Sequence, residues 1–205
     1  MASTSKPRSG SWSTRDIVVT AALAVASGVS FIIVDWIYIL ATGALGQIAQ
    51  PIFEGLWLTG ALIVPYVVRR PGSALFGELV ASIVEASFNP FGITVIIAGL
   101  LEGIGAEVIF FLTGYKRFSW QVMAIAGAFD ALLFFVTWQS WRSGYINVSG
   151  GFHLQMTPAL IVGYLVIEML SGAVAGWLSK GVGDALVPTG VLDGFPIAAH
   201  RIPEI

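Results

Sequence analysis

The feature that most constrains the fold is a series of apolar stretches long enough to cross a lipid bilayer. A membrane-spanning helix needs about 20 largely apolar residues. Stretches of this kind lie at residues 15–40, 51–69, 73–88, 92–114, 119–141 and 157–179. Only 11% of the 205 residues are charged, whereas soluble domains have about a quarter. The mean hydropathy is +0.84. The sequence therefore predicts an all-α integral membrane protein with six transmembrane helices.

Basic residues at the ends of these stretches predict the orientation. Lys and Arg cluster before the first stretch and after the second, the fourth and the sixth, and only Arg142 lies on the opposite side. Because cytoplasmic loops are enriched in Lys and Arg, both termini are predicted to be cytoplasmic. We expect a flexible cytoplasmic tail at 1–14, a six-helix transmembrane domain at 15–182, and an exposed cytoplasmic C-terminal tail at 183–205, which is rich in Pro and Gly.

Several classes of function are excluded by residues that the sequence lacks. Without cysteine, the chain forms no disulfide, thiolate metal site or iron–sulfur cluster. The two histidines, His153 and His200, are too few for a histidine metal site, so we predict no metal and no cofactor. A net charge of −2 argues against a nucleic-acid partner, because nucleic-acid-binding proteins are usually basic. The sequence has no GxxxxGK[ST] motif to bind ATP and no nucleophile–base pair within the spans, so no catalytic residues are predicted.

Carboxylates within the apolar stretches are the main functional signal. They are Asp35, Glu54, Glu78, Glu85, Glu102, Glu107, Asp130 and Glu168. Each costs roughly 2.5–3.5 kcal/mol near the middle of a membrane, and no basic residue lies inside a span to compensate for it. Either several are protonated or a cation lies among them.

The stretch LFGELVASIVEASFNPFG places its polar residues on one helical face. Glu78, Ser82, Glu85 and Asn89 are spaced i, i+4, i+7 and i+11. We expect its Glu85–Asn89 end to form one wall of a pocket that opens to the outside. Aromatic faces together with acids suit a flat organic cation. The predicted substrate-binding residues are Glu54, Trp57, Glu85, Asn89, Glu102, Trp138, Tyr164 and Glu168. For two acids a structural role remains an alternative to ligand binding. Glu54 could cap a helix N-terminus, and for Glu78 the two roles are equally favoured.

The first apolar stretch has two rows of small residues four apart. One row is Thr20, Ala24 and Gly28, and the other is Ala22, Ala26 and Ser30. Small residues at this spacing allow a neighbouring helix to approach closely. Packing within the protein is the default interpretation, but one of two rows on neighbouring faces could contact another protein.

The stretches FEGLWLTGALIVPYVVRRPGSALFGELVASIVEA and NPFG resemble the YkoE-type branch of the S components of energy-coupling factor (ECF) vitamin transporters, over roughly residues 15–182. The resemblance implies a substrate-binding subunit of an ABC importer in the bacterial plasma membrane. Such a subunit captures thiamine or its hydroxymethylpyrimidine precursor from outside and works with a transmembrane coupling (T) subunit and two ATPase subunits.

The resemblance also implies roles for particular residues. Ala22 and Ala26 would contact the coupling subunit, with Ser30 departing from an all-alanine row. The first outer loop, from Tyr38 to Gln50, would act as a lid in which Gly43 and Gly46 allow movement.

The expected ligand contacts are Glu85 and Asn89 on the pyrimidine edge, Glu102 or Glu168 near the cation, and Trp138 or Tyr164 stacking. Two other functions stay open from the residues alone. One is a proton-coupled carrier for a small organic cation, and the less favoured one is an intramembrane enzyme.

Overall fold

A computed structural model describes residues 12–142, 146–147, 153–154 and 157–201. The helices are α1 (Thr14–Leu45), α2 (Ala49–Trp57), α3 (Thr59–Val68), α4 (Ser73–Glu85), α5 (Thr94–Leu112), α6 (Trp120–Phe134), α7 (Ser140–Arg142) and α8 (Pro158–Leu186). Shorter helical turns are η1 (Gly46–Ile48), η2 (Phe135–Gln139, a π-helix), η3 (Val187–Thr189) and η4 (Pro196–Arg201). Two short strands, β1 (Ile146–Asn147) and β2 (His153–Leu154), pair antiparallel. Most of the predicted tail at 1–14 lies outside the described residues.

Each predicted span coincides with helical structure, which confirms the all-α fold. The second span is divided at Leu58 into α2 and α3. Four stretches are long and apolar enough to cross a membrane: Thr14–Val68, Thr94–Leu112, Trp120–Arg142 and Pro158–Thr189. The first of these contains two of the predicted spans, and α4 has only 13 residues. The arrangement of six crossings therefore stays a prediction.

Local sequence signals explain where the helices begin. Ser13 and Asp16 form a capping box at the start of α1, and Ser119 caps α6 through the backbone N–H of Val122. Thr157 caps α8, with Pro158 as its first residue. The start of α4 has no cap from its own sequence, and a side chain of α5 supplies one instead: the Glu107 carboxylate accepts from the backbone N–H groups of Gly72 and Ala74.

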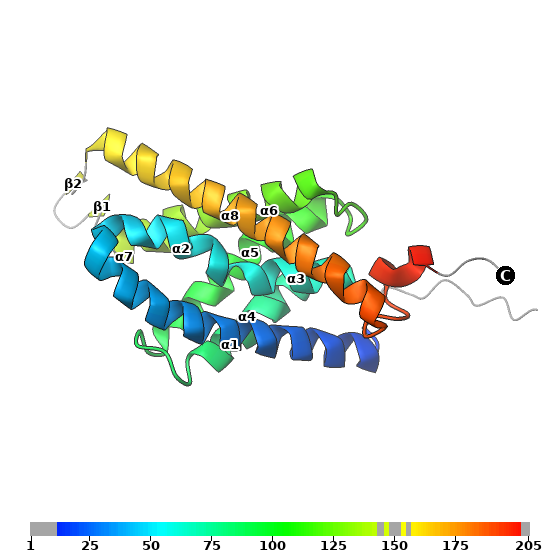
Figure 1. The fold of residues 1–205 in the computed structure, drawn as a ribbon. Coiled ribbons are helices and arrows are strands. Elements are labelled where there is room, and N and C mark those ends of the chain that lie inside the picture. The colour runs from blue at the N-terminus through cyan, green and yellow to red at the C-terminus, as the bar shows by residue number, and fades with distance from the viewer. Residues whose placement is uncertain (1–11, 143–145, 148–152, 155–156, 202–205) are drawn as a thin grey trace, which may run out of the picture.

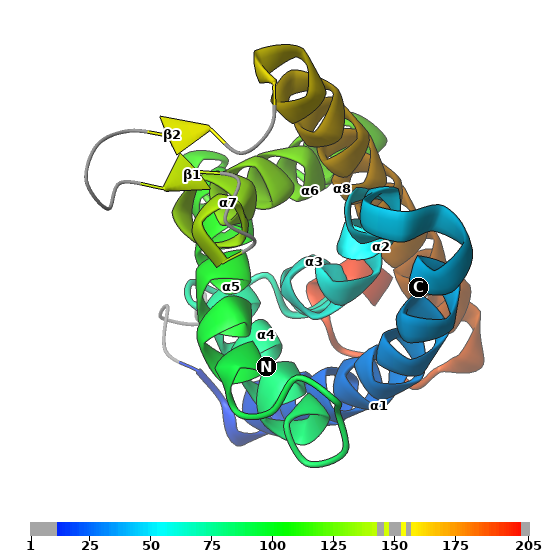
Figure 2. The ribbon, with the colours of Figure 1, turned by 90° about the vertical axis from the view of Figure 1, so that its left-hand side faces the viewer.

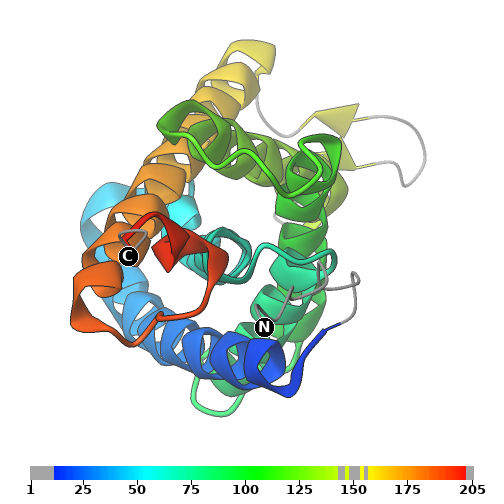
Figure 3. The same ribbon diagram turned by 90° about the vertical axis from the view of Figure 1, so that its right-hand side faces the viewer.

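Helix α3 lies at the centre of the molecule. In the end-on views, α1, α4, α5, α6 and α8 surround it (Figures 2 and 3). Eight of its ten residues are buried, including Leu62, Val64 and Val67. Because other helices surround it, α3 needs no polar face and can be apolar all round. The surrounding helices present apolar side chains outward, as contact with lipid requires.

Glycines allow the closest helix approaches. A Cβ on Gly127 of α6 would collide with the carbonyl oxygen of Gly172 in α8, and one on Gly176 would collide with the carbonyl oxygen of Met123. In α1, Gly28 lies against the backbone of α4 at Ala81. Small residues thus let neighbouring backbones touch, as expected where lipid gives no hydrophobic drive for association.

The two ends of the helix bundle differ. The start of α1 and the end of α8 lie at one end, whereas α7, the two strands and the start of α8 lie at the other (Figure 1). The predicted exposed C-terminal tail is wrong for part of its length. Leu192, Phe195, Ile197 and Ala198 are buried, and η4 lies across the end of the bundle near α3 (Figure 3). The apolar side chains of Leu192, Phe195 and Ile197 join the main core and are thereby removed from water.

Candidate functional site

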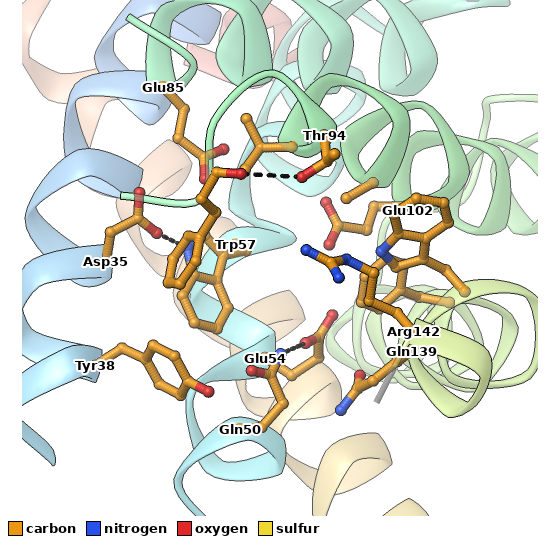
Figure 4. A pocket seen from close by; sticks show the side chains of 15 residues that line it. Asp35, Tyr38, Gln50, Glu54, Trp57, Glu85, Thr94, Glu102, Gln139 and Arg142 are labelled. Carbon is orange, nitrogen blue, oxygen red and sulfur yellow. Dashed lines mark hydrogen bonds between the residues drawn. The ribbon is translucent and has the colours of Figure 1, made fainter. Parts of the chain in front are cut away.

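A cavity of about 200 Å³ lies in the half of the molecule away from the start of α1. Its walls come from α1, α2, the end of α4, the α4–α5 connection, α5, the end of α6, η2 and α7. Figure 4 shows the side chains that line it. Segments that are far apart in the sequence therefore meet around one hollow.

Four carboxyl groups face this cavity, and each comes from a different helix. They are Asp35 of α1, Glu54 of α2, Glu85 of α4 and Glu102 of α5. Asp35 and Glu54 are fully buried, and the other two are 5% and 6% exposed. Separate helices hold the four groups around one space, so any of them that are ionised act on a common position.

Hydrogen bonds orient two of these acids. The Trp57 indole Nε1 donates to Asp35 Oδ1 at 2.9 Å, and Gln50 Nε2 donates to Glu54 Oε2 at 3.0 Å. The other oxygen of Glu54 has no hydrogen-bond partner among the described residues. A buried carboxyl oxygen without a partner is costly, so a ligand donor or cation at this position would be stabilised.

Aromatic rings complete the lining. Tyr38 meets Trp57 edge-on with 5.4 Å between ring centroids, and Phe91 lies 6.0 Å from Tyr38. Phe134 and Trp138 face the cavity from the side of α6 and η2. Flat rings beside carboxylates can hold a planar cationic ligand by stacking and by charge-assisted hydrogen bonds.

The expectation that the outer acids lack any basic neighbour is wrong. Arg142, at the end of α7, lines the cavity and its guanidinium points inward (Figure 4). In the sequence Arg142 directly follows the span predicted at 119–141, but no spacing along the chain relates it to the acids beside which it lies. No ion pair of Arg142 is found among the described residues.

Of the eight predicted substrate-binding residues, five line the cavity: Glu54, Trp57, Glu85, Glu102 and Trp138. Three do not. Asn89 orders the α4–α5 connection, because its Nδ2 donates to the Glu85 carbonyl at 2.9 Å and its Oδ1 accepts from Phe91 N–H at 2.6 Å. The Tyr164 hydroxyl donates to the Gln47 carbonyl at 3.1 Å. Glu168 is fully buried in α8 and does not line the cavity.

Sequence reasoning did not include Asp35, Gln50, Thr94 or Gln139 among the substrate-binding residues, although all four line the cavity. The sequence spacing could have indicated Gln50, because it precedes Glu54 by one helical turn and so lies on the same helical face.

The chain between Tyr38 and Gln50 is not an open loop, because α1 continues to Leu45 and η1 follows at once. Tyr38 lines the cavity, and Gly46 has a positive φ of 59° that suits glycine. Gly43 lies in the last turns of α1, and the lid stays a prediction.

The deeper acids have structural surroundings of their own. Glu78 accepts a hydrogen bond from Ala61 N–H at 2.6 Å, and Glu107 caps α4. Asp130 is fully buried against Gly105. Among the described residues, no group of three His, Cys, Asp or Glu side chains is arranged to hold a metal ion.

Three comparisons with known proteins each match the chain to a transport protein. Residues 15–133 match the family described as "ABC-type cobalt transport system, permease component". The chain is 34% identical over 189 residues to the "Putative HMP/thiamine permease protein YkoE" of Bacillus subtilis (strain 168), covering 91% of this chain and 90% of that protein. A solved structure titled "Crystal structure of an S-component of ECF transporter" matches with a TM-score of 0.84 and 33% identity, covering 93% of each chain.

Proposed function

The chain belongs to the YkoE-type family of ECF transporter S components, which are integral proteins of the plasma membrane, and from this premise we propose that it captures thiamine or its hydroxymethylpyrimidine precursor from outside the cell. The observation that supports this ligand class is the cavity lined by four buried carboxyl groups and several aromatic rings. Thiamine has a permanently cationic thiazolium and an aminopyrimidine whose edge both donates and accepts hydrogen bonds.

Each proposed contact follows from the chemistry of the lining. The thiazolium would lie in the field of Glu54 and Glu102, whose carboxylates favour a cation. Glu85 would accept from the pyrimidine amino group. Trp57 and Trp138 offer faces for stacking, each worth about 0.5–2 kcal/mol with a cation. Tyr164, Glu168 and Asn89 would act indirectly, by holding the walls rather than by touching the ligand.

The proposed transport cycle needs partners. As in ABC importers of the ECF type, a coupling subunit and two ATPase subunits would supply the energy. The row of Ala22, Ala26 and Ser30 on α1 is exposed, which suits contact with another membrane helix. Six crossings with both termini in the cytoplasm agree with the start of α1 and the end of α8 lying at one end (Figure 1).

The proposal is tested by binding and by uptake. The purified protein should bind thiamine or hydroxymethylpyrimidine in isothermal titration calorimetry, and mass spectrometry should detect one of them in protein purified from cells. Uptake by cells that express the chain should depend on co-expressed coupling and ATPase subunits. Uptake without them that collapses on adding a protonophore would instead support a proton-coupled carrier.

A further inference from the structure

Arg142 differs from the other basic residues because it lies at the ligand cavity. The other described Lys and Arg residues lie at the ends of the helices away from the cavity. The backbone beside Arg142 is anchored: the neighbouring Trp141 indole Nε1 donates to the Val136 carbonyl across the π-helix at 2.9 Å. Arg142 itself is exposed at the rim, so its long side chain can turn either into the cavity or toward the outer surface.

The charges around Arg142 are unequal. Four carboxyl groups, all at most 6% exposed, share the cavity with one guanidinium. Salt bridges in the described part of the chain do not include Arg142, so none of these carboxylates lies within 4.0 Å of its nitrogens. Arg142 thus lies at a cavity lined by acids, without a short ion pair that would hold its guanidinium in one position.

We propose that Arg142 is a resident counter-cation, which occupies the cavity in the empty protein and is displaced when a cationic ligand enters. Its guanidinium and the ligand cation compete for the same negative field. Arg142 thereby sets how strongly the site prefers a cationic ligand over a neutral one. This inference rests on the proposed function, because it takes thiamine as the cation and hydroxymethylpyrimidine as the neutral comparison.

The test compares two ligands on one substitution. Arg142→Gln removes the charge at an exposed position and keeps a polar side chain. We expect thiamine to bind about tenfold tighter, since one like charge a few ångströms away is worth at least that much at an effective dielectric of about 20. Binding of hydroxymethylpyrimidine, measured by calorimetry at mildly alkaline pH where its ring is uncharged, should change by less than about twofold.

Two control variants separate charge from other effects. Arg142→Lys retains the charge and should behave like the wild type. Arg117→Gln removes a charge from an exposed residue in the α5–α6 connection, far from the cavity, and should change neither affinity. Parallel weakening of both ligands in Arg142→Gln would overturn the proposal, because it would mean that Arg142 donates to the ligand. An unchanged ratio of the two affinities would overturn it as well.

A third measurement keeps the inference separate from the proposed function. If the wild type binds neither ligand, the proposed function fails, and guanidinium ion below denaturing concentration then serves as the probe. Trp57 and Trp138 line the cavity and report on its occupancy by fluorescence. Arg142→Gln should show a saturable response to guanidinium that the wild type lacks. Equal responses of the two proteins would refute the role of Arg142.

Discussion

Chemically identical carboxylates have different roles in this protein, depending on what lies next to each. Glu54 faces the cavity, and one of its oxygens has no partner among the described residues. Glu107 instead satisfies the first backbone N–H groups of α4 and accepts from the Tyr115 hydroxyl. Burial raises the pKa of Tyr115, so this hydroxyl stays protonated and remains a donor. A buried acid is tolerated only where a donor, a cation or a proton reaches it.

Substitution of the cavity acids should weaken ligand binding without unfolding the protein. Glu85→Gln and Glu102→Gln keep the side-chain volume. Each replaces one carboxyl oxygen by an amide NH2 group, which removes the negative charge and one hydrogen-bond acceptor. We expect each to reduce the affinity for thiamine by about 1–3 kcal/mol, because each removes a charge-assisted hydrogen bond or a favourable charge. Calorimetric titration measures the loss, and unchanged affinity in both variants would dismiss the cavity as the thiamine site.

Glu107→Gln is the matched control, since it removes a carboxylate of the same chemistry outside the cavity. It should lower the stability of the protein by about 1–3 kcal/mol through the lost cap and leave thiamine affinity unchanged. The apparent melting temperature in detergent is the readout for stability. A loss of affinity with no change in stability would contradict the structural role of Glu107.

At the scale of whole elements, α1 presents two different faces made of similar small residues. Thr20, Ala24 and Gly28 are buried, and Gly28 lies against α4. The row of Ala22, Ala26 and Ser30 is exposed. Packing within the protein thus accounts for one row only, and the other has no contact in the described structure that explains its small side chains.

A bulky side chain on the exposed row should disrupt the transporter but not the subunit. Ala26→Trp is expected to leave thiamine binding intact and to reduce uptake on the order of tenfold or more, because close helix approach needs small residues. Co-purification with the coupling subunit measures the interface directly. Val25→Trp, about 100° around the helix, is the control and should retain both uptake and co-purification. Normal uptake by Ala26→Trp would place the interface elsewhere.

At the scale of the whole molecule, the cavity lies apart from the end of the bundle that η4 covers. The segment that follows α8 folds back onto the bundle and buries Phe195. The Arg15 guanidinium lies over the Phe195 ring, 4.8 Å from its centroid. The cavity is lined by residues in the other half of the bundle, and no residue of α3, the helix that contacts η4, lines it. We therefore expect that substitutions can alter stability and ligand binding separately.

Truncation of Phe195 tests this separation. Phe195→Ala should destabilise the protein by about 3 kcal/mol, since it leaves a void in the core. The affinity for thiamine should stay within about twofold of the wild type, because the substitution leaves every cavity contact in place. Thermal unfolding in detergent and calorimetry provide the two readouts. A strong loss of affinity would show that the end covered by η4 and the cavity are coupled.

The amino-acid pattern was enough to establish the helical class and the approximate positions of the long helices, because spans must satisfy every backbone group within themselves and must be apolar. It did not show that the second span divides at Leu58 or that α1 continues to Leu45. It also identified Glu54, Glu85 and Glu102, since an acid inside an apolar helix stands out in one dimension. Which acids share a space became known only from the folded chain. The four carboxyl groups of the cavity come from four helices, and no sequence spacing relates them.

Packing between helices also brought Arg142 to the acids and returned the C-terminal segment to the core. Helix periodicity fixes which residues share one face of one helix, and hydropathy indicates which helices are apolar enough to enter the membrane. Neither fixes how the helices rotate about their own axes and which faces meet. That choice depends on close contacts such as those of Gly28, Gly127 and Gly172, where backbone meets backbone.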